Sequence, residues 1–349
     1  MTIRIDSRSI GTGHEPYVIA ELSANHSGEI TRAFDIMNAA KKSGASAVKI
    51  QTYRPDTITL NSDREDFRIV DGLWKGRTLY DLYEEAHTPW EWHADLFQHA
   101  RAIGITLFSS PFDTTAVDLL EDLNTPAYKI ASFEVIDLPL IRYVAATGKP
   151  MIMSTGMADL DEIEEAVDCA RDAGCKDLAL LHCVSGYPAP ASDYNLKTLV
   201  DLHSRYGLVT GLSDHTLENT TAIAAVALGA SIIEKHMTLD RSAGGPDDSF
   251  SLEPAEFADL CTSARTAWSA LGKIDYTRKS SEVENVKFRR SLYFVEPLPE
   301  GAIITKQSVR SVRPGYGAAP KFLDEIIGKR VKSAVQENTP VDLENIDWQ

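Results

Sequence analysis

Residues 208–236 read LVTGLSDHTLENTTAIAAVALGASIIEKH, in which two short apolar segments flank an amphipathic one. We expect strands at 208–213 and 231–236 with a helix at 218–229 between them, which is a parallel strand-helix-strand unit. Both strands end in residues able to do chemistry, Ser213-Asp214-His215 and Glu234-Lys235-His236. The stretch therefore predicts a parallel sheet with reactive side chains along one edge.

The same unit recurs upstream. Further strands are expected at 17–22, 46–51, 105–110, 127–131, 150–154 and 178–183. Helices are expected at 29–43, 90–103, 113–123, 137–147, 160–173, 195–205 and 254–271. Eight strand-helix units are the signature of a (β/α)8 TIM barrel. The alternative is a doubly wound open sheet, which usually has fewer strands and a glycine-rich first turn. The loop after Glu21 (LSANHSGE) lacks the G-x-G-x-x-G pattern of such a turn.

Composition and charge narrow the function classes. The 349 residues are 43% hydrophobic and 25% charged, as in an ordinary globular protein with one large domain and a small companion. A net charge of −16 argues against nucleic acids and membrane surfaces as partners, because both require a basic surface. No apolar run approaches the roughly 20 residues that span a bilayer, and the N-terminus lacks a signal-peptide core. We therefore expect a cytoplasmic protein.

One connection in the predicted barrel is unusually long. It runs between residues 51 and 89, on the side of the carboxyl ends of the strands, and Trp74, Tyr80 and Tyr83 give it apolar faces. Loops of this length are generally lids or substrate-binding insertions. A packed excursion with its own small core explains the same residues equally well.

The character of the sequence changes after Tyr276. The polar stretch TRKSSEVENVK is followed by RRSLYFVEPLPEGAIITKQSVRSVRPG, which predicts short strands with turns at Pro-Glu-Gly and Arg-Pro-Gly. We expect a barrel domain at 1–277, a linker at 278–288 and a small β-rich domain at 289–349. A domain of this size has a small core and is expected to dock on another surface.

Two histidines end neighbouring strands of the predicted barrel. Side chains alternate along a strand, so Ser213 and His215 share one face, as do Glu234 and His236. Active sites of parallel barrels lie at the carboxyl ends of the strands. Two imidazoles there suit a divalent ion such as Mn, Fe, Co or Zn, although a lone histidine is more often a structural residue.

Two lysines, Lys49 and Lys129, also end strands and point inward. A buried ammonium must meet an anion or lose its charge. The anion is either a substrate phosphate or carboxylate, or a structural glutamate such as Glu21 or Glu134. Several rim hydroxyls favour a phosphorylated ligand, and a Schiff-base pyruvate aldolase would also use a barrel lysine. Asp247 follows a tight Gly-Gly-Pro turn, where it is either held rigidly over the barrel mouth or caps the turn.

Read together, eight stretches resemble the sialic acid synthase family over nearly the whole chain: AELSANHSG, AVKIQTY, FSSPFD, PAYKIASFE, STGM, GLSDHT, IEKHMTL and GGPDDSFSLEP. These enzymes are transferases that condense phosphoenolpyruvate with an N-acetylated amino sugar to give a nine-carbon 2-keto acid. The tail RRSLYF…RPG…IGKR is similar to the antifreeze-like (SAF) domain that follows the barrel in this family. Within the family the chain is most similar to the pseudaminic acid synthase branch, whose acceptor is 2,4-diacetamido-2,4,6-trideoxy-altrose. N-acetylneuraminate and legionaminate synthesis are the alternatives.

The resemblance implies a role for each matched residue. The residues expected to hold phosphoenolpyruvate are Lys49, Lys129, Ser132, Ser154 and Ser213, with Ser110 as a helper. A divalent metal, Mn²⁺ in first place and Mg²⁺ or Co²⁺ otherwise, is expected on His215 and His236. Contacts to the acceptor sugar are expected from Gln51, Glu134, Tyr187 and Asp247. The candidate catalytic residues are Glu134, Glu21 and Asp247, with Glu134, Glu21 or a metal-bound water activating the attacking water. Arg313 is expected to reach the active site of a second subunit in a domain-swapped homodimer.

Two other function classes are compatible with parts of the sequence. The first is the Schiff-base aldolase, which borohydride trapping on Lys49 or Lys129 would reveal. The second is a non-catalytic sugar- or ice-binding protein built on the tail. The charged residues at the barrel rim argue against this second class.

Overall fold

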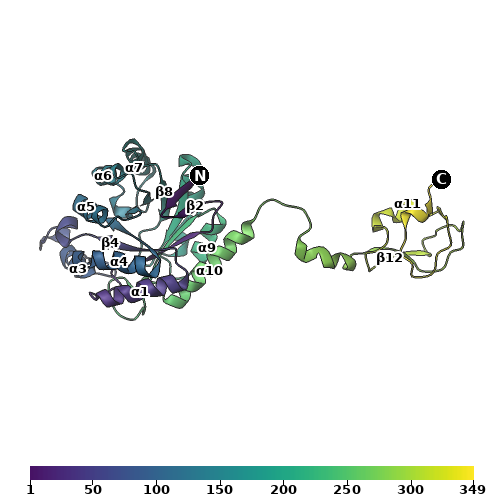
Figure 1. Cartoon of the computed structure of the whole chain (residues 1–349), viewed down its shortest axis with the longest axis horizontal. Coiled ribbons are helices and arrows are strands. Elements are labelled where there is room, and N and C mark those ends of the chain that lie inside the picture. Colours follow the sequence, from purple (N-terminus) through teal and green to yellow (C-terminus); the bar gives the residue numbers. More distant parts are fainter. The chain divides into compact units, whose positions relative to one another are not determined.

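The computed structural model describes residues 1–349 and confirms the predicted (β/α)8 barrel followed by a small β-rich domain. Residues Met1–Gly272 form one compact unit and Lys273–Gln349 form another (Figure 1). Eight parallel strands close the barrel in the order β3-β4-β5-β6-β7-β8-β9-β10, and β10 pairs with β3. A closed sheet excludes the doubly wound alternative.

The strand bounds differ from the predicted ones by at most one residue. The barrel strands are β3 (Tyr17–Glu21), β4 (Ala47–Thr52), β5 (Thr106–Pro111), β6 (Tyr128–Ile130), β7 (Met151–Ser154), β8 (Leu178–Cys183), β9 (Val209–Asp214) and β10 (Ile232–His236). The helices around them are α1 (Ile30–Ser43), α4 (His93–Ile103), α5 (Thr114–Asp122), α6 (Leu138–Ala146), α7 (Leu160–Asp172), α8 (Lys197–Tyr206), α9 (Thr220–Ala227) and α10 (Pro254–Leu271). A short 3-10 helix, η2 (Trp90–Trp92), fills the start of the predicted helix 90–103.

Local sequence explains where these helices begin and end. At the start of α7, the Asp159 carboxylate accepts from the backbone N–H of Glu162 at 2.9 Å, and the Glu162 carboxylate accepts from the N–H of Asp159 at 2.9 Å. This reciprocal pair satisfies two N–H groups that the helix leaves free. Helices α1 and α4 end at Gly44 and Gly104, whose φ angles of 91° and 69° favour glycine. The chain can then turn back into the next strand.

Side-chain alternation sorts each barrel strand into an inner and an outer face. In β4, Val48 and Ile50 pack in the apolar cluster between strands and helices, whereas Ala47 packs in a separate cluster inside the barrel. Lys49 and Gln51 share the inner face with Ala47, as the sequence predicts. The inner face therefore carries apolar residues at the beginning of the strand and polar ones at its carboxyl end.

The sequence analysis missed an N-terminal hairpin of two short strands, β1 (Thr2–Ile5) and β2 (Arg8–Gly11), which pair antiparallel. Ile3, Ile5 and Ile10 are buried in the same cluster as the inward-facing residues of the barrel. The hairpin thus closes the end of the barrel at which the strands begin. The alternation of Ile3 and Ile5 with polar residues is the signal that would have predicted it.

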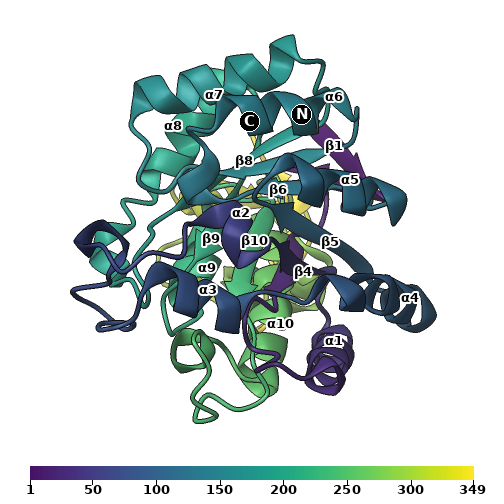
Figure 2. The ribbon, with the colours of Figure 1, turned by 90° about the vertical axis from the view of Figure 1, so that its left-hand side faces the viewer.

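The long insertion after β4 folds into α2 (Pro55–Ile58), a 3-10 turn η1 (Glu65–Phe67) and α3 (Leu79–Ala86). Figure 2 looks onto the end of the barrel over which α2 and α3 lie. At the base of the insertion, the Tyr53 ring packs edge-on against Tyr83 at 5.7 Å and Phe112 at 5.1 Å. The insertion is therefore anchored by an aromatic cluster beside the carboxyl ends of the strands.

The second unit has a core of its own. Its first element is the 3-10 helix η6 (Ser280–Phe288). Its strands β11 (Ser291–Phe294) and β12 (Val309–Val312) pair antiparallel, as do β13 (Arg330–Val331) and β14 (Ile346–Asp347). Its remaining elements are η7 (Pro320–Phe322), α11 (Leu323–Ile326) and η8 (Leu343–Asn345). Three further 3-10 helices lie in the barrel unit: η3 (Ser132–Glu134), η4 (Ala191–Asp193) and η5 (Asp248–Phe250). Ten buried apolar residues, among them Leu292, Phe294 and Ile346, form the core. In neither unit is any helix both long and apolar enough to traverse a lipid bilayer.

Candidate active site

The carboxyl ends of the strands bring together side chains that lie far apart in the sequence. Lys49 pairs in register with Glu21 on the neighbouring strand, and Glu21 pairs in turn with His236. On the other side of β10, Glu234 pairs with Ser213 of β9. Strand pairing thus places ionisable side chains at the same level of one barrel mouth.

Two lysines and two glutamates form a buried ionic network at this level. Lys49 Nζ lies 2.8 Å from Glu21 Oε2 and 3.6 Å from Glu234 Oε1, and Lys129 Nζ lies 3.9 Å from the same Glu234 oxygen. Burial alone would raise the pKa of Glu234, but Lys129 and Lys49 hold it below its usual value. Burial lowers the pKa of Lys129. The network contains two cations and two carboxylates, so it adds no net positive charge when all four are ionised.

Serine hydroxyls surround the network. Lys49 Nζ donates to Ser110 Oγ at 3.2 Å, and Ser213 Oγ donates to Glu234 Oε1 at 3.5 Å. The Ser154 Oγ is buried and has no hydrogen-bond partner. A buried polar atom without a partner is costly, so Ser154 is a free donor available to a ligand.

Gly156 leaves room for two more hydroxyls. A Cβ at this position would lie 2.6 Å from Ser185 Oγ and 2.8 Å from Ser132 Oγ. The Ser185 Oγ is also buried without a partner. Only a residue without a side chain leaves both hydroxyls in place, so Gly156 completes a cradle of donors suited to the oxygens of a phosphate or carboxylate.

The two predicted metal ligands lie side by side. The ring centroids of His215 and His236 are 5.5 Å apart. His215 Nδ1 donates to the Val184 carbonyl at 2.8 Å, so in the neutral ring Nδ1 carries the proton and Nε2 has a free lone pair. His236 Nδ1 is buried without a partner, and burial together with His215 holds the pKa of His236 well below its usual value, so this ring is neutral. Neutral imidazoles with free nitrogens fit a divalent metal.

The histidine pair does not complete a coordination sphere by itself. No group of three or more His, Cys, Asp or Glu side chains is arranged to hold a metal ion. A metal on these two rings would take its other ligands from water or substrate, as open catalytic sites do. Although burial opposes it, Cys183 raises the pKa of His215, so metal binding there would displace a proton and weaken as the pH falls.

Two of the predicted sugar-side residues, Gln51 and Asp247, are joined through Ser23, which the sequence analysis did not single out. Gln51 Nε2 donates to Glu21 Oε1 at 2.9 Å and to Ser23 Oγ at 3.0 Å. Ser23 Oγ donates in turn to Asp247 Oδ2 at 2.5 Å. Burial raises the pKa of Asp247. These hydrogen bonds fix the Asp247 carboxylate beside the barrel mouth, so Asp247 does more than cap its turn.

Aromatic rings line the histidine side of the mouth. The Tyr187 ring lies 4.3 Å from the His215 ring and 5.2 Å from that of Phe250, centroid to centroid. Phe250 also packs against His236 at 5.0 Å and is 2% exposed. The histidines are therefore backed by apolar side chains, which lower the local dielectric around the site.

Glu134 occupies the 3-10 turn that follows β6. Its Oε2 is buried without a hydrogen-bond partner. Burial raises the pKa of Glu134 to about 7, although Lys129 opposes this shift. A carboxyl group with this pKa can both accept and donate a proton near neutral pH.

The structure brings all of the predicted barrel residues to one mouth, and one further predicted residue belongs to the other unit. Arg313 lies in the second unit, directly after β12, and is exposed. Glu234 and Ser23 were missing from the predicted site residues, and Ser185 was counted among the rim hydroxyls without a role of its own. The signal for Glu234 was its alternation with His236 on the inner face. In contrast, Lys235 faces outward and forms a buried ion pair with Asp214 at 2.8 Å, a structural role.

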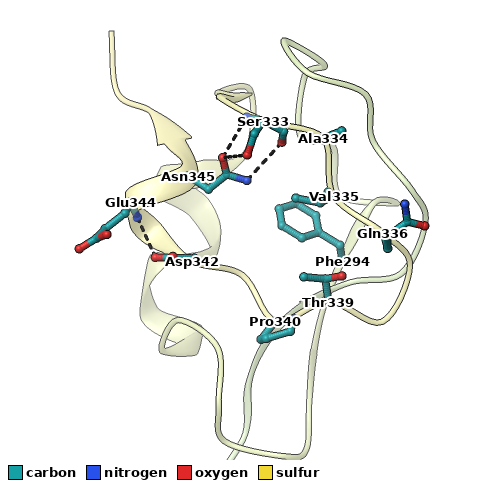
Figure 3. Close-up of a pocket in the computed structure, with 10 residues that line it drawn as sticks. All are labelled: Phe294, Ser333, Ala334, Val335, Gln336, Thr339, Pro340, Asp342, Glu344 and Asn345. Atoms are coloured by element: carbon teal, nitrogen blue, oxygen red, sulfur yellow. Dashed lines mark hydrogen bonds between the residues drawn. The ribbon is translucent and has the colours of Figure 1, made fainter.

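Two cavities are lined by other residues. One, of about 560 Å³ in the second unit, is lined by Phe294 and by residues of the segments 333–340 and 342–345 (Figure 3). Its amide and hydroxyl groups pair with one another, since Ser333 Oγ donates to Asn345 Oδ1 at 2.7 Å. The other, of about 680 Å³, lies between residues 188–196 and 216–224 of the barrel unit. Neither contains a predicted site residue.

Comparison with known proteins agrees with this arrangement. Residues 36–276 match the NeuB family and residues 289–347 match the SAF domain. The chain is 44% identical to pseudaminic acid synthase of Campylobacter jejuni, over 94% of this chain and 96% of the relative. It is 41% identical to pseudaminic acid synthase of Helicobacter pylori, over 95% and 98% of the two chains.

Among solved structures, one similar fold is that of N-acetylneuraminic acid (sialic acid) synthetase from Leptospira borgpetersenii in complex with citrate. The TM-score is 0.73 and the identity 30%, over 83% of this chain and 96% of that one. Identity to this synthetase is lower than identity to the two pseudaminic acid synthases. The resemblance expected from the sequence motifs is thus confirmed.

Proposed function

The chain belongs to the NeuB family, and we propose that it catalyses the reaction of a pseudaminic acid synthase. In this reaction phosphoenolpyruvate and 2,4-diacetamido-2,4,6-trideoxy-altrose condense to a nine-carbon 2-keto acid, and phosphate leaves by C–O cleavage. The observation that carries the proposal is the identity of 41–44% to two pseudaminic acid synthases over nearly the whole chain. The buried lysines and the cradle of serine hydroxyls support an anionic phosphorylated substrate.

The residues of the barrel mouth suggest how the two substrates are held. Lys49 and Lys129, with the hydroxyls around Gly156, would bind the phosphate and carboxylate oxygens of phosphoenolpyruvate. Gln51, Tyr187 and the Asp247 carboxylate would hold the sugar so that its aldehyde carbon faces the methylene carbon of phosphoenolpyruvate. Fixing both reactants in one orientation removes much of the entropic cost of a bimolecular reaction.

The chemistry then needs one water molecule and one proton acceptor. The methylene carbon attacks the aldehyde carbon, whose oxygen becomes a hydroxyl by taking up a proton from solvent, and the cationic centre that forms on the former enol carbon is captured by water. The Glu134 carboxylate would take the proton from this water, since its pKa of about 7 leaves much of it ionised at neutral pH. Collapse of the tetrahedral intermediate breaks the C–O bond and releases phosphate.

Charge balance supports a divalent cation at the histidine pair. The two lysines are already paired with Glu21 and Glu234, so a phosphoenolpyruvate anion would enter a site without surplus positive charge. A metal, Mn²⁺ by our proposal, would bind the free nitrogens of His215 and His236. Lewis-acid polarisation of the sugar aldehyde is the chemistry that such an ion supplies when bound.

We also propose a homodimer in which Arg313 of one subunit completes the site of the other. In support, large apolar side chains are exposed on the loops that follow the strand ends: Phe133 (55%), Ile136 (62%), Met157 (74%) and Leu217 (44%). Several large apolar side chains exposed at one end of the barrel favour an interaction surface there. The cytoplasmic location remains a prediction from the sequence.

The test is phosphate release with phosphoenolpyruvate and Mn²⁺, offering the pseudaminate precursor, the legionaminate precursor and N-acetylmannosamine in parallel. Release with the first sugar alone is expected. Release with N-acetylmannosamine or the legionaminate precursor would keep the reaction and overturn the acceptor. No release with any of the three would contradict the condensation. Borohydride trapping of pyruvate on Lys49 or Lys129 would instead indicate a Schiff-base aldolase.

A further inference from the structure

We propose that Trp74 is a positioning residue that fastens the insertion over the acceptor sugar and thereby sets the affinity for the sugar. This inference rests on the proposed function, because it assigns a role in binding that acceptor. Trp74 lies in the insertion between β4 and η2, outside the strands that carry the lysines and histidines. It contacts Pro246, which precedes Asp247, and Tyr187, and both Asp247 and Tyr187 are assigned to the sugar.

Trp74 is held at the tip of a closed loop. The N–H of Ile69 donates to the Arg77 carbonyl at 2.9 Å, and the N–H of Gly76 donates to the Ile69 carbonyl at 2.8 Å. Arg68 and Thr78 form an antiparallel bridge at the base of the same loop. The loop is thus a small hairpin that presents Trp74 as a unit.

The indole of Trp74 connects this hairpin to two sugar-side elements. Its Nε1–H donates to the Pro246 carbonyl at 3.1 Å, and Pro246 directly precedes Asp247. Its ring lies 6.1 Å from the ring of Tyr187, which packs on His215. One side chain therefore contacts both the turn that carries Asp247 and the ring of Tyr187.

Burial shows that some part of the mouth has to move for substrates to enter. Lys49, Lys129 and His236 are only 3%, 2% and 8% exposed, yet two substrates must reach them. The insertion is the segment best suited to move, because Leu82 is the one buried residue between 54 and 87. Segments with few buried contacts open at low free-energy cost. The Trp74 contacts to Pro246 and Tyr187 then define the closed position.

We call the contacts of Trp74 with Pro246 and Tyr187 the latch. Loss of the latch should affect the binding of the two substrates differently. The residues proposed to bind phosphoenolpyruvate lie on the barrel strands and on the turns after β6, β7 and β8. Of these turns, Trp74 contacts only the one after β8, and it does so through Tyr187, which is assigned to the sugar. Asp247 and Tyr187, the groups that Trp74 does hold, are assigned to the sugar. Weakening the latch should therefore raise KM for the sugar and leave KM for phosphoenolpyruvate almost unchanged.

The kinetic test compares three variants of the full chain. Trp74→Phe keeps a ring but removes the N–H donor, and a lost neutral hydrogen bond predicts a rise in sugar KM of about 5–10-fold. Trp74→Ala should raise it further. Leu73→Ala, at the neighbouring exposed position, is the matched control and should leave both KM values within about twofold. Equal rises for both substrates, or wild-type values in Trp74→Phe, would overturn the proposal.

A second measurement does not depend on turnover. Lys75, whose side chain is 68% exposed, is a trypsin site next to the latch. Cleavage after Lys75 without ligand should be several-fold faster in Trp74→Phe than in the wild type or Leu73→Ala, and equal rates would contradict the latch. If no sugar supports turnover but the cleavage rates differ, the proposed function fails and the latch itself stands. If turnover occurs and the rates are equal, the latch alone fails.

Discussion

Glu234 Oε1 lies 3.6 Å from Lys49 Nζ, although their strands, β10 and β4, are separated by β3 in the barrel. The ion pair therefore crosses the barrel interior, where both residues are buried. The same oxygen is the only carboxylate oxygen within 4.0 Å of Lys129. Glu234 thus neutralises two cations that the proposed substrate would also contact.

Glu234→Gln should lower the thermal midpoint, because Lys129 is left buried without a carboxylate; breaking a buried pair costs about 3–5 kcal/mol. Phosphoenolpyruvate should then raise the midpoint of the variant by more than that of the wild type, since the anion replaces the missing charge. Thermal shift with and without phosphoenolpyruvate measures both effects. Glu218→Gln removes a charge at an exposed position and serves as the control. Equal shifts in variant and wild type would contradict the role of Glu234.

Ionisation of Glu134 should cause the rise of kcat on the acidic side of the pH–rate profile. Burial raises the pKa of Glu134 to about 7. If its carboxylate accepts the proton of the attacking water, kcat should rise with pH and level off above about 7. In Glu134→Gln this rise should be absent and kcat should be lower by about 100-fold or more. A pH–rate profile from 5.5 to 8.5 tests both, and an unchanged profile in the variant would exclude Glu134 as the base.

The same shift has a consequence for stability. The folded-state pKa of Glu134 lies above the ordinary value of 4.5, so between these values the folded state holds a proton that the unfolded state has lost. Stability should fall as the pH rises through this window. Glu134→Gln should therefore be more stable than the wild type at pH 8, by about 1–3 kcal/mol, and nearly equal to it at pH 4. Urea denaturation at the two pH values measures the difference.

Gly156→Ala tests the cradle of hydroxyls. The added Cβ would lie 2.6 Å from Ser185 Oγ and 2.8 Å from Ser132 Oγ, so both hydroxyls must rotate away while the backbone remains in place. We expect KM for phosphoenolpyruvate to rise about tenfold or more from the loss of two hydrogen bonds. Gly13→Ala is a matched control, because no atom lies within 4 Å of its Cβ position. An unchanged KM in Gly156→Ala would remove the cradle from the binding site.

His215→Ala and His236→Ala test the metal site. Each variant should weaken Mn²⁺ binding by more than about 100-fold, because each removes one of two protein ligands. Isothermal titration calorimetry at pH 7.5 gives the affinity without requiring turnover. His203→Ala, on helix α8, is the control and should bind Mn²⁺ as the wild type does. Retained affinity in either site variant would show that the ion binds elsewhere.

Mixing two inactive variants tests the contribution of Arg313 to a second subunit. If sites are completed across the dimer, Arg313→Ala and His236→Ala should each be inactive alone. Hybrid dimers would contain one intact site, so an equal mixture should recover about a quarter of the wild-type activity. Analytical ultracentrifugation checks that both variants remain dimeric. Full activity of Arg313→Ala, or no recovery in mixtures that do form hybrids, would exclude the cross-subunit role.

Periodicity and strand-end residues were sufficient to predict the barrel and most of its mouth. His215 and His236 were placed side by side because side chains alternate along a strand and neighbouring parallel strands end at one level. Lys49 was likewise placed on the inner face, but the sequence left its partner open between a substrate and a glutamate. The structure shows Glu21 as that partner.

Tertiary structure alone decided the relationships that cross strands and loops. From the sequence, the insertion that contains Trp74 could equally be a lid or a packed excursion. In the folded chain the Trp74 indole donates to the carbonyl of Pro246, a residue more than 170 positions away. The link from Gln51 through Ser23 to Asp247 and the cradle at Gly156 arise in the same way. By itself the sequence determined which residues face the barrel interior, because alternation and strand order are local properties. Which of them touch depends on barrel closure and loop packing, which no local pattern encodes.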